Sequence, residues 1–322
     1  MSHFPISTPL GLGDLLDRVF RLYRVHAAKF LLAVAVFIVP MGLLSAFLVE
    51  NTAANLFLVL RALQSDQTIQ PTNQTGSWFF LLAPLAFMVQ GFVSLASSQL
   101  AIDALHNRDL EVKRVLWVAF RKFFPWLIMT ILMALLMLMV AIVMLVVFAL
   151  GGMILGVMVA AFATLSAPVF NDASNTAVAV GLVILFVAIY LGIILLFTSP
   201  FLYFYARWSV AVPALLDGNL GPTEAIRRSW RLTKFNVRRA IGYLILAYLL
   251  AFVILGTPTS ALQLVTGLAF PTENQWLLVG LFSAINVSAS LLTSPISAIA
   301  YVLFYYELRV RKESYDLEMA LQ

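Results

Sequence analysis

The chain has 322 residues, of which 62% are hydrophobic and 11% are charged, and its formal net charge is +5. A soluble domain cannot cover this much apolar side chain with polar surface, so the composition excludes a soluble globular protein and predicts an integral membrane protein. The sequence contains no cysteine, which excludes disulfides, thiolate metal sites and cysteine nucleophiles.

Six apolar stretches predict membrane-spanning helices, because a span needs roughly 20 apolar residues to cross about 30 Å of hydrocarbon. We expect an all-α, polytopic integral membrane protein with a single membrane domain over residues 1–322. The first stretch is too long for the core of a signal peptide and follows a charged segment, so we expect it to be a retained span. The stretches are 28–49, 78–102, 124–149, 176–201, 239–256 and 276–304.

The positions of the basic residues predict the orientation of these spans. Of the 20 Lys and Arg residues, all except Arg61 lie in four clusters that the apolar stretches separate. Positively charged loops stay in the cytoplasm during insertion. We therefore expect both termini on the cytoplasmic side of a bacterial inner membrane, with 51–77, 150–175 and 257–275 on the other side. The clusters lie within 18–29, 108–122, 207–239 and 309–312.

A further apolar stretch at 150–170 leaves room for a seventh span. Counting it as a span would move residues 206–239, with their many basic side chains, to the outer side. The positive-inside bias opposes that placement, so six spans are the better prediction. The sequence leaves open whether 150–170 extends a long helix or folds back at the outer surface.

An amphipathic pattern precedes three of the predicted spans: an acidic residue, an aromatic residue six positions later and a basic residue ten positions later. A helix that is apolar on one face and basic on the other suits the plane of the lipid headgroups, so we expect three interfacial helices. With the spans that follow, they predict a threefold parallel repeat over 9–108, 109–219 and 220–312, before a short tail at 313–322. The instances are Asp14, Phe20 and Arg24; Glu111, Trp117 and Arg121; and Glu224, Trp230 and Lys234.

The basic faces of the first and third of these helices predict contacts with anionic lipid headgroups rather than with nucleic acid. A plain alternative is that each helix only guides the chain into the next span. The predicted headgroup residues are Arg18, Arg21, Arg24, Arg227, Arg228 and Arg231.

Polar residues within the apolar stretches suggest a second kind of site. A Thr-Ser-Pro sequence occurs in both the fourth and the sixth stretch, and proline bends a span by freeing a carbonyl one turn earlier. Transporters often bind their substrates at such interruptions. For Asp103 and Arg207 we expect a structural ion pair or snorkelling rather than a proton relay. The residues of this intramembrane set are Gln99, Asp103, Thr198, Pro200, Arg207, Asn286, Thr293 and Pro295.

Motifs of catalysis are missing from the sequence. His3, His26 and His106 stand apart, without carboxylates at metal-ligand spacing. The sequence has neither a phosphate-binding glycine loop nor a nucleophile elbow. We therefore expect no catalytic residue, metal or cofactor. The predicted function is a non-catalytic membrane scaffold or accessory module that engages lipid headgroups or a partner protein; a transporter of a lipid or small amphiphile is the second hypothesis, and an enzyme of lipid metabolism the third.

Three segments resemble a known family: GDLLDRVFRLYR at 13–24, AIRRSWRLT at 225–233 and YYELRVRKESYDLE at 305–318. They are similar to the bacterial membrane proteins named after the membrane domain of glycerophosphoryl diester phosphodiesterases. The resemblance covers nearly the whole chain and implies a stand-alone membrane module, with other membrane or soluble proteins as partners. The family's catalytic barrel has no counterpart in this sequence, so we do not expect diesterase activity.

Overall fold

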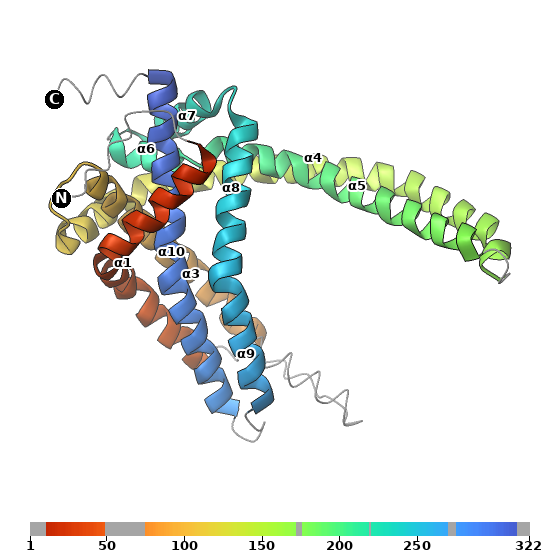
Figure 1. Cartoon of the computed structure of the whole chain (residues 1–322), viewed down its shortest axis with the longest axis horizontal. Coiled ribbons are helices and arrows are strands. Elements are labelled where there is room, and N and C mark those ends of the chain that lie inside the picture. Colours follow the sequence, from red (N-terminus) through yellow and green to blue (C-terminus); the bar gives the residue numbers. More distant parts are fainter. Residues whose placement is uncertain (1–10, 49–74, 172–175, 219, 270–274, 314–322) are drawn as a thin grey trace. The chain divides into compact units, whose positions relative to one another are not determined.

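The computed structural model describes residues 11–48, 75–171, 176–218, 220–269 and 275–313 (Figure 1). Every secondary-structure element in these ranges is a helix, which confirms the all-α prediction for this part of the chain. The helices are α1 (Leu12–Leu48), α3 (Thr75–Leu105), α4 (Val112–Asn171), α5 (Thr176–Trp208), α6 (Ala211–Asp217), α7 (Pro222–Thr233), α8 (Val237–Ala251), the π-helix η2 (Phe252–Gly256), α9 (Thr257–Ala269) and α10 (Gln275–Glu313).

Six helical segments among the described residues are long and apolar enough to cross a membrane, which confirms the predicted number of apolar helices. Each of them overlaps one of the apolar stretches of the sequence. The segments are Leu12–Ala46, Leu82–Leu105, Val112–Val147, Val187–Asp217, Val237–Thr266 and Gly280–Glu313.

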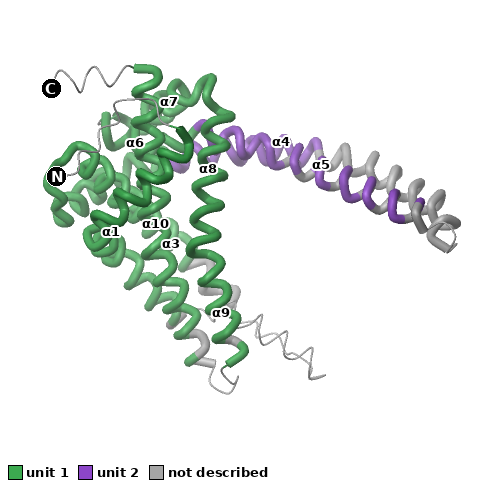
Figure 2. The backbone as a smooth tube through the Cα atoms, in the orientation of Figure 1, with its two compact units in different colours: residues 1–129, 208–322 green, residues 130–207 purple. Residues whose placement is uncertain are grey.

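The chain divides into two compact units, one formed by residues 1–129 and 208–322 and the other by residues 130–207 (Figure 2). In the first unit, α10 is the central helix: α1 and α3 pack against it and against each other, and α8 and α9 also contact it. Most of its buried side chains lie between Pro295 and Val310, and Phe282 is buried as well. This unit contains all the ion pairs described below.

The first predicted interfacial helix is the beginning of α1 rather than a separate helix. Non-helical backbone angles at His26 (φ −118°, ψ 18°) kink α1 between this segment and the following span. Leu15, Leu16 and Val19 of the apolar stripe are buried. Because protein covers most of this stripe, its hydrophobicity is explained by packing within the first unit, while Asp14, Asp17, Arg21 and Arg24 on the charged side are exposed.

The other two predicted interfacial helices differ from the first. Residues 112–123 continue into the span of α4 without a break. Only α7 is a separate helix, with Pro222 in its first turn and with Ala225, Ser229, Leu232 and Thr233 buried. These three segments therefore join their spans in three different ways, by a kink, by a continuous helix and by a turn.

The fifth span continues beyond its predicted end at Gly256. Pro258 has no backbone N–H to donate, and the helix adapts to it through the π-helix η2, in which the Thr257 N–H reaches the carbonyl of Phe252. The Ser260 hydroxyl donates to the Gly256 carbonyl at 2.9 Å. The chain stays helical through Ala269, and most of the predicted outer loop 257–275 is helix.

In the second unit, the chain from Thr130 to Asn171 and α5 form an antiparallel helical hairpin (Figure 2). The stretch 150–170 is a continuation of α4, which agrees with the long-helix alternative left open by the sequence. With 60 residues, α4 is about 90 Å long. Large apolar side chains along the hairpin are exposed, for example Leu138, Leu145 and Leu195. Such surfaces suit lipid as the surrounding solvent.

Gly91 of α3 offers a test of the packing in the first unit. A Cβ atom at this position would lie 2.3 Å from the Trp126 ring, which is buried and rigid. We expect Gly91→Ala to lower the free energy of unfolding by about 1–3 kcal/mol, as overpacked cores do. Thermal unfolding in detergent measures the change, and Gly280→Ala is the matched control because a Cβ there meets no atom within 4 Å. Equal stability of both variants would show that α3 and α4 do not pack closely at this point.

Candidate functional site: a polar network at the basic end of α10

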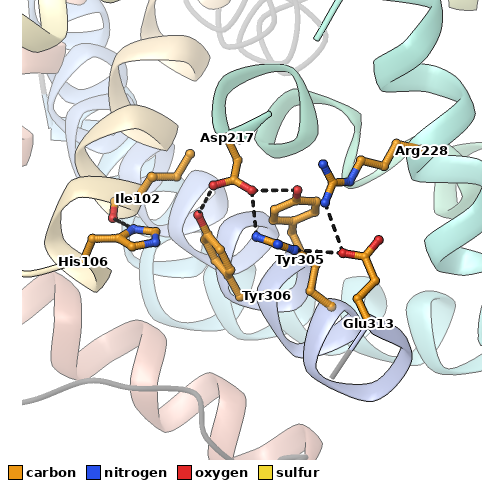
Figure 3. A network of polar contacts seen from close by, with 8 residues as sticks. Ile102, His106, Asp217, Arg228, Tyr305, Tyr306 and Glu313 are labelled. Atoms are coloured by element: carbon orange, nitrogen blue, oxygen red, sulfur yellow. Dashed lines mark hydrogen bonds and ion pairs between the residues drawn. The ribbon is translucent and has the colours of Figure 1, made fainter. Parts of the chain in front are cut away.

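Asp217, the last residue of α6, accepts three hydrogen bonds from α10 (Figure 3). Tyr306 Oη donates to Asp217 Oδ1 at 2.7 Å, and Tyr305 Oη donates to Asp217 Oδ2 at 2.9 Å. The Arg309 guanidinium forms an ion pair with the same oxygen at 3.0 Å. Both carboxylate oxygens are therefore engaged by donors from one helix, and the carboxylate fixes α6 to α10.

Glu313 extends this network from α10 to α7. Its Oε2 accepts from Arg309 Nε at 3.0 Å, one turn earlier, and from Arg228 Nη2 of α7 at 3.1 Å. The guanidinium carbons of Arg309 and Arg228 also lie 5.9 and 5.8 Å from the centre of the Tyr305 ring. The ring of His106, at the end of α3, packs edge-on against Tyr306. Elements from four parts of the chain thus meet around Tyr305 and Tyr306.

Glu307 is a second buried carboxylate on α10, with an exposed fraction of 0%. Its Oε1 accepts from Arg239 Nη2 of α8 at 3.0 Å and forms a short contact with Arg311 Nε. Its Oε2 is buried without a hydrogen-bond partner among the described residues. A buried charge is costly unless it is paired, so the two arginines are required to keep this carboxylate inside the protein.

The turn between α7 and α8 carries an exposed aromatic residue. Phe235 has a φ of 70° and is 87% exposed. The ammonium groups of Lys234 and Lys312 lie 5.1 and 5.7 Å from its ring centre. Lys312 also donates to the carbonyl of Arg231 at 2.9 Å and to that of Lys234. A lysine at the end of a helix complements the helix dipole, so Lys312 fixes the end of α7 to α10.

These contacts join α6, α7 and α8 to α10, and we call the set of residues that makes them the latch. The latch consists of Asp217, Arg228, Arg239, Tyr305, Tyr306, Glu307, Arg309, Arg311 and Glu313. Each of its carboxylates faces at least one arginine. Ion pairs of this kind consume the acceptors that a general base would need. In the part of the chain that the structure describes, no three His, Asp or Glu side chains gather as metal ligands.

The predicted headgroup arginines lie on two helices, α1 and α7. Arg21, Arg24, Arg227 and Arg231 are exposed. Arg18 is only partly exposed, and Arg228 belongs to the latch through Glu313. The six predicted residues therefore divide into an exposed group that can meet an external anion and a partner-bound group that serves the fold.

In the intramembrane set, Asp103 has structural partners. It is fully buried, and its Oδ2 lies 2.6 Å from Arg114 Nη2 at the start of α4. Gln99 donates to its Oδ1 at 3.0 Å. Asp103 thus has an ion-pair partner, Arg114, that the sequence pattern did not single out. The guanidinium of Arg207 donates to Tyr203 Oη at 2.9 Å and lies 5.2 Å from the centre of that ring.

The remaining polar residues of this set lie within continuous helices. Asn286 donates to the Phe282 carbonyl, and Thr293 donates to the Ala289 carbonyl, both at 2.8 Å and within α10. Thr198 is exposed on α5 in the second unit, whereas Thr293 belongs to the first unit. Both helices continue through their prolines, Pro200 and Pro295.

Several residues of the latch were not predicted from the sequence as site residues. Tyr305, Tyr306 and Glu307 lie in one of the segments that carry the family resemblance, which is the only sequence signal for them. Their partner Asp217 lies 88 and 89 positions away from the two tyrosines. A pattern within one segment cannot indicate a contact over such a distance.

Comparison with known proteins gives no family for this chain. No protein-family model matches it, and searches of curated proteins and of solved structures found no match.

Proposed function

We propose that the protein is a non-catalytic scaffold of the bacterial inner membrane that presents the basic end of its helices to anionic lipid headgroups. The supporting observation is the division of the arginines at this end. The acidic residues of the latch are each paired with arginines inside the protein, while Arg21, Arg24, Arg227, Arg231 and Arg238 are exposed.

This division gives the exposed surface its charge. Because Asp217 and Glu307 are buried or nearly buried and already paired, they compensate few of the exposed cations. Each basic residue near an anionic membrane surface contributes about 1 kcal/mol of attraction. Exposed Asp14, Asp17 and Glu224 offset part of this attraction. The excess of cations on α7 and the start of α8, from Arg227, Arg231 and Arg238, retains anionic lipids around this end of the protein.

The orientation follows from the same charges. Basic segments are retained in the cytoplasm, and the cytoplasmic leaflet is the anionic one. We therefore place the basic end and both termini on the cytoplasmic side. A scaffold in this position holds anionic lipid close to the exposed turn at Phe235, where a partner protein of the membrane or the cytosol has access.

The double variant Arg227→Glu, Arg231→Glu tests the proposal. Two reversed charges at about 1 kcal/mol each are expected to lower the amount of co-purifying phosphatidylglycerol by at least about tenfold, measured by mass spectrometry of extracted lipids. Arg227→Lys, Arg231→Lys is the matched control and is expected to retain the lipid. Arg228 is left unchanged because it pairs with Glu313. Undiminished anionic lipid in the reversed variant would contradict the proposal.

A further inference from the structure

An apolar groove lies between α1, α8 and α10 in the first unit, with a volume of 70 Å³. Leu16, Val19 and Phe20 of α1 form one wall. The lining on the other two helices consists of Leu244, Ala247, Tyr248, Leu250 and Ala251 of α8 and Ile296, Ser297, Ala300 and Tyr301 of α10. All three walls belong to segments that are apolar enough to cross a membrane.

The groove has few polar groups that could bind a water molecule. Its volume exceeds the roughly 15 Å³ that one water molecule needs, but a water also requires two to four polar partners. The Ser297 hydroxyl already donates to the Ser294 carbonyl at 2.9 Å. Apolar cavities of this kind stay dry and accept apolar ligands.

A pair of stacked rings separates the groove from the charges of the latch. Tyr243 and Phe304 are fully buried and stack with their centres 4.9 Å apart. The Tyr243 hydroxyl donates to the carbonyl of Ala300, a residue of the groove wall, at 3.1 Å. On both helices this pair lies between the groove and the ion pair of Arg239 with Glu307. The groove is therefore an apolar compartment that ends below the charged cluster.

We propose that this groove seats an acyl chain of an anionic phospholipid. Acyl chains are the apolar molecules that surround helices in a membrane. Arg24 is exposed and lies one turn beyond Phe20 on the same face of α1, where it can meet the lipid phosphate. The inference adds a specific chain site to the proposed headgroup surface; it shares the membrane setting of that proposal but does not depend on Arg227 and Arg231.

Photo-crosslinking tests the site. The full-length protein is reconstituted with phosphatidylglycerol that carries a diazirine in one acyl chain, and the adducts are mapped by peptide mass spectrometry. We expect adducts together on 16–20, 244–251 and 296–301. Ala247→Phe fills the groove and is expected to reduce them by about tenfold, the effect of losing the burial of roughly two methylene groups. Ala28→Leu, on an exposed position of α1 outside the groove, is the control for added bulk.

The outcomes separate this site from the headgroup surface. Ala251→Leu narrows the other end of the groove and replaces Ala247→Phe if that variant unfolds. Adducts spread evenly over exposed apolar faces such as 131–147, or unchanged by the filling variants, would overturn the groove. Equal labelling by the matching phosphatidylcholine probe would overturn the selection of an anionic lipid through Arg24. Labelling that persists in the Arg227→Glu, Arg231→Glu variant supports the groove even if the headgroup proposal fails.

Discussion

Replacing Asp217 by alanine is expected to destabilise the protein by about 3–5 kcal/mol, because the change removes one partner from a largely buried ion pair. Arg309 would lose its carboxylate at 3.0 Å, and the hydroxyls of Tyr305 and Tyr306 would lose their acceptor. Thermal or denaturant unfolding in detergent, followed by tryptophan fluorescence, measures the loss.

Asp109→Ala is the matched control for Asp217→Ala, because Asp109 is exposed in the segment between α3 and α4. Its free energy of unfolding is expected to change by less than about 0.5 kcal/mol, as at most surface positions. If the two variants were equally stable, Asp217 would not hold α6 against α10, and the latch would have no role in the fold.

The second large effect is expected at Glu307. Glu307→Ala leaves Arg239 and Arg311 without their shared carboxylate, and we expect a loss of about 3 kcal/mol in the free energy of unfolding. Glu307→Gln keeps an oxygen that can accept a hydrogen bond, so its loss is expected to be smaller, about 1–2 kcal/mol.

Glu313→Ala provides the comparison on the same helix, because the Glu313 side chain is 36% exposed. Exposed ion pairs contribute at most about 1 kcal/mol. We therefore expect the free energy of unfolding to be highest for Glu313→Ala, lower for Glu307→Gln and lowest for Glu307→Ala. The reverse order, with Glu307→Ala the most stable, would mean that the buried carboxylate is not held by its arginines.

The sequence was a good guide to the helices and a poorer guide to their ends. Apolar length alone predicted six segments that have the composition to cross a membrane, and the structure contains them. The end of the fifth span was placed too early, because Gly256 and Pro258 are ordinary signals for the end of a helix. The helix instead accommodates Pro258 through the π-helix η2 and continues to Ala269.

The amphipathic segments show why a pattern does not identify its own environment. Leu15, Leu16 and Val19 form an apolar stripe that would suit a membrane surface or a protein interior equally well. The structure buries them within the first unit. Only tertiary packing distinguishes the two environments. The helical spacing of the apolar residues contains no information about that packing.

The candidate site shows the same limit. For Asp103 the sequence left an ion pair and snorkelling open, and its partner in the structure, Arg114, is one basic residue among several nearby. For the latch, Asp217 and Arg309 are separated by 92 positions, and one whole candidate span, Val237–Thr266, lies between them. The charge clusters did predict where cations accumulate, while the fold decided which of them remain exposed.

The side of the membrane on which the basic end lies can be measured with single cysteines. The chain has no natural cysteine, so Arg227→Cys and Gln275→Cys each introduce one unique thiol, at α7 and at the start of α10. Intact cells are treated with a membrane-impermeant maleimide before and after permeabilisation. We expect Gln275→Cys to react in intact cells and Arg227→Cys to react only after permeabilisation, since basic segments stay in the cytoplasm. Labelling of Arg227→Cys in intact cells would place the basic end outside and contradict the proposed cytoplasmic position.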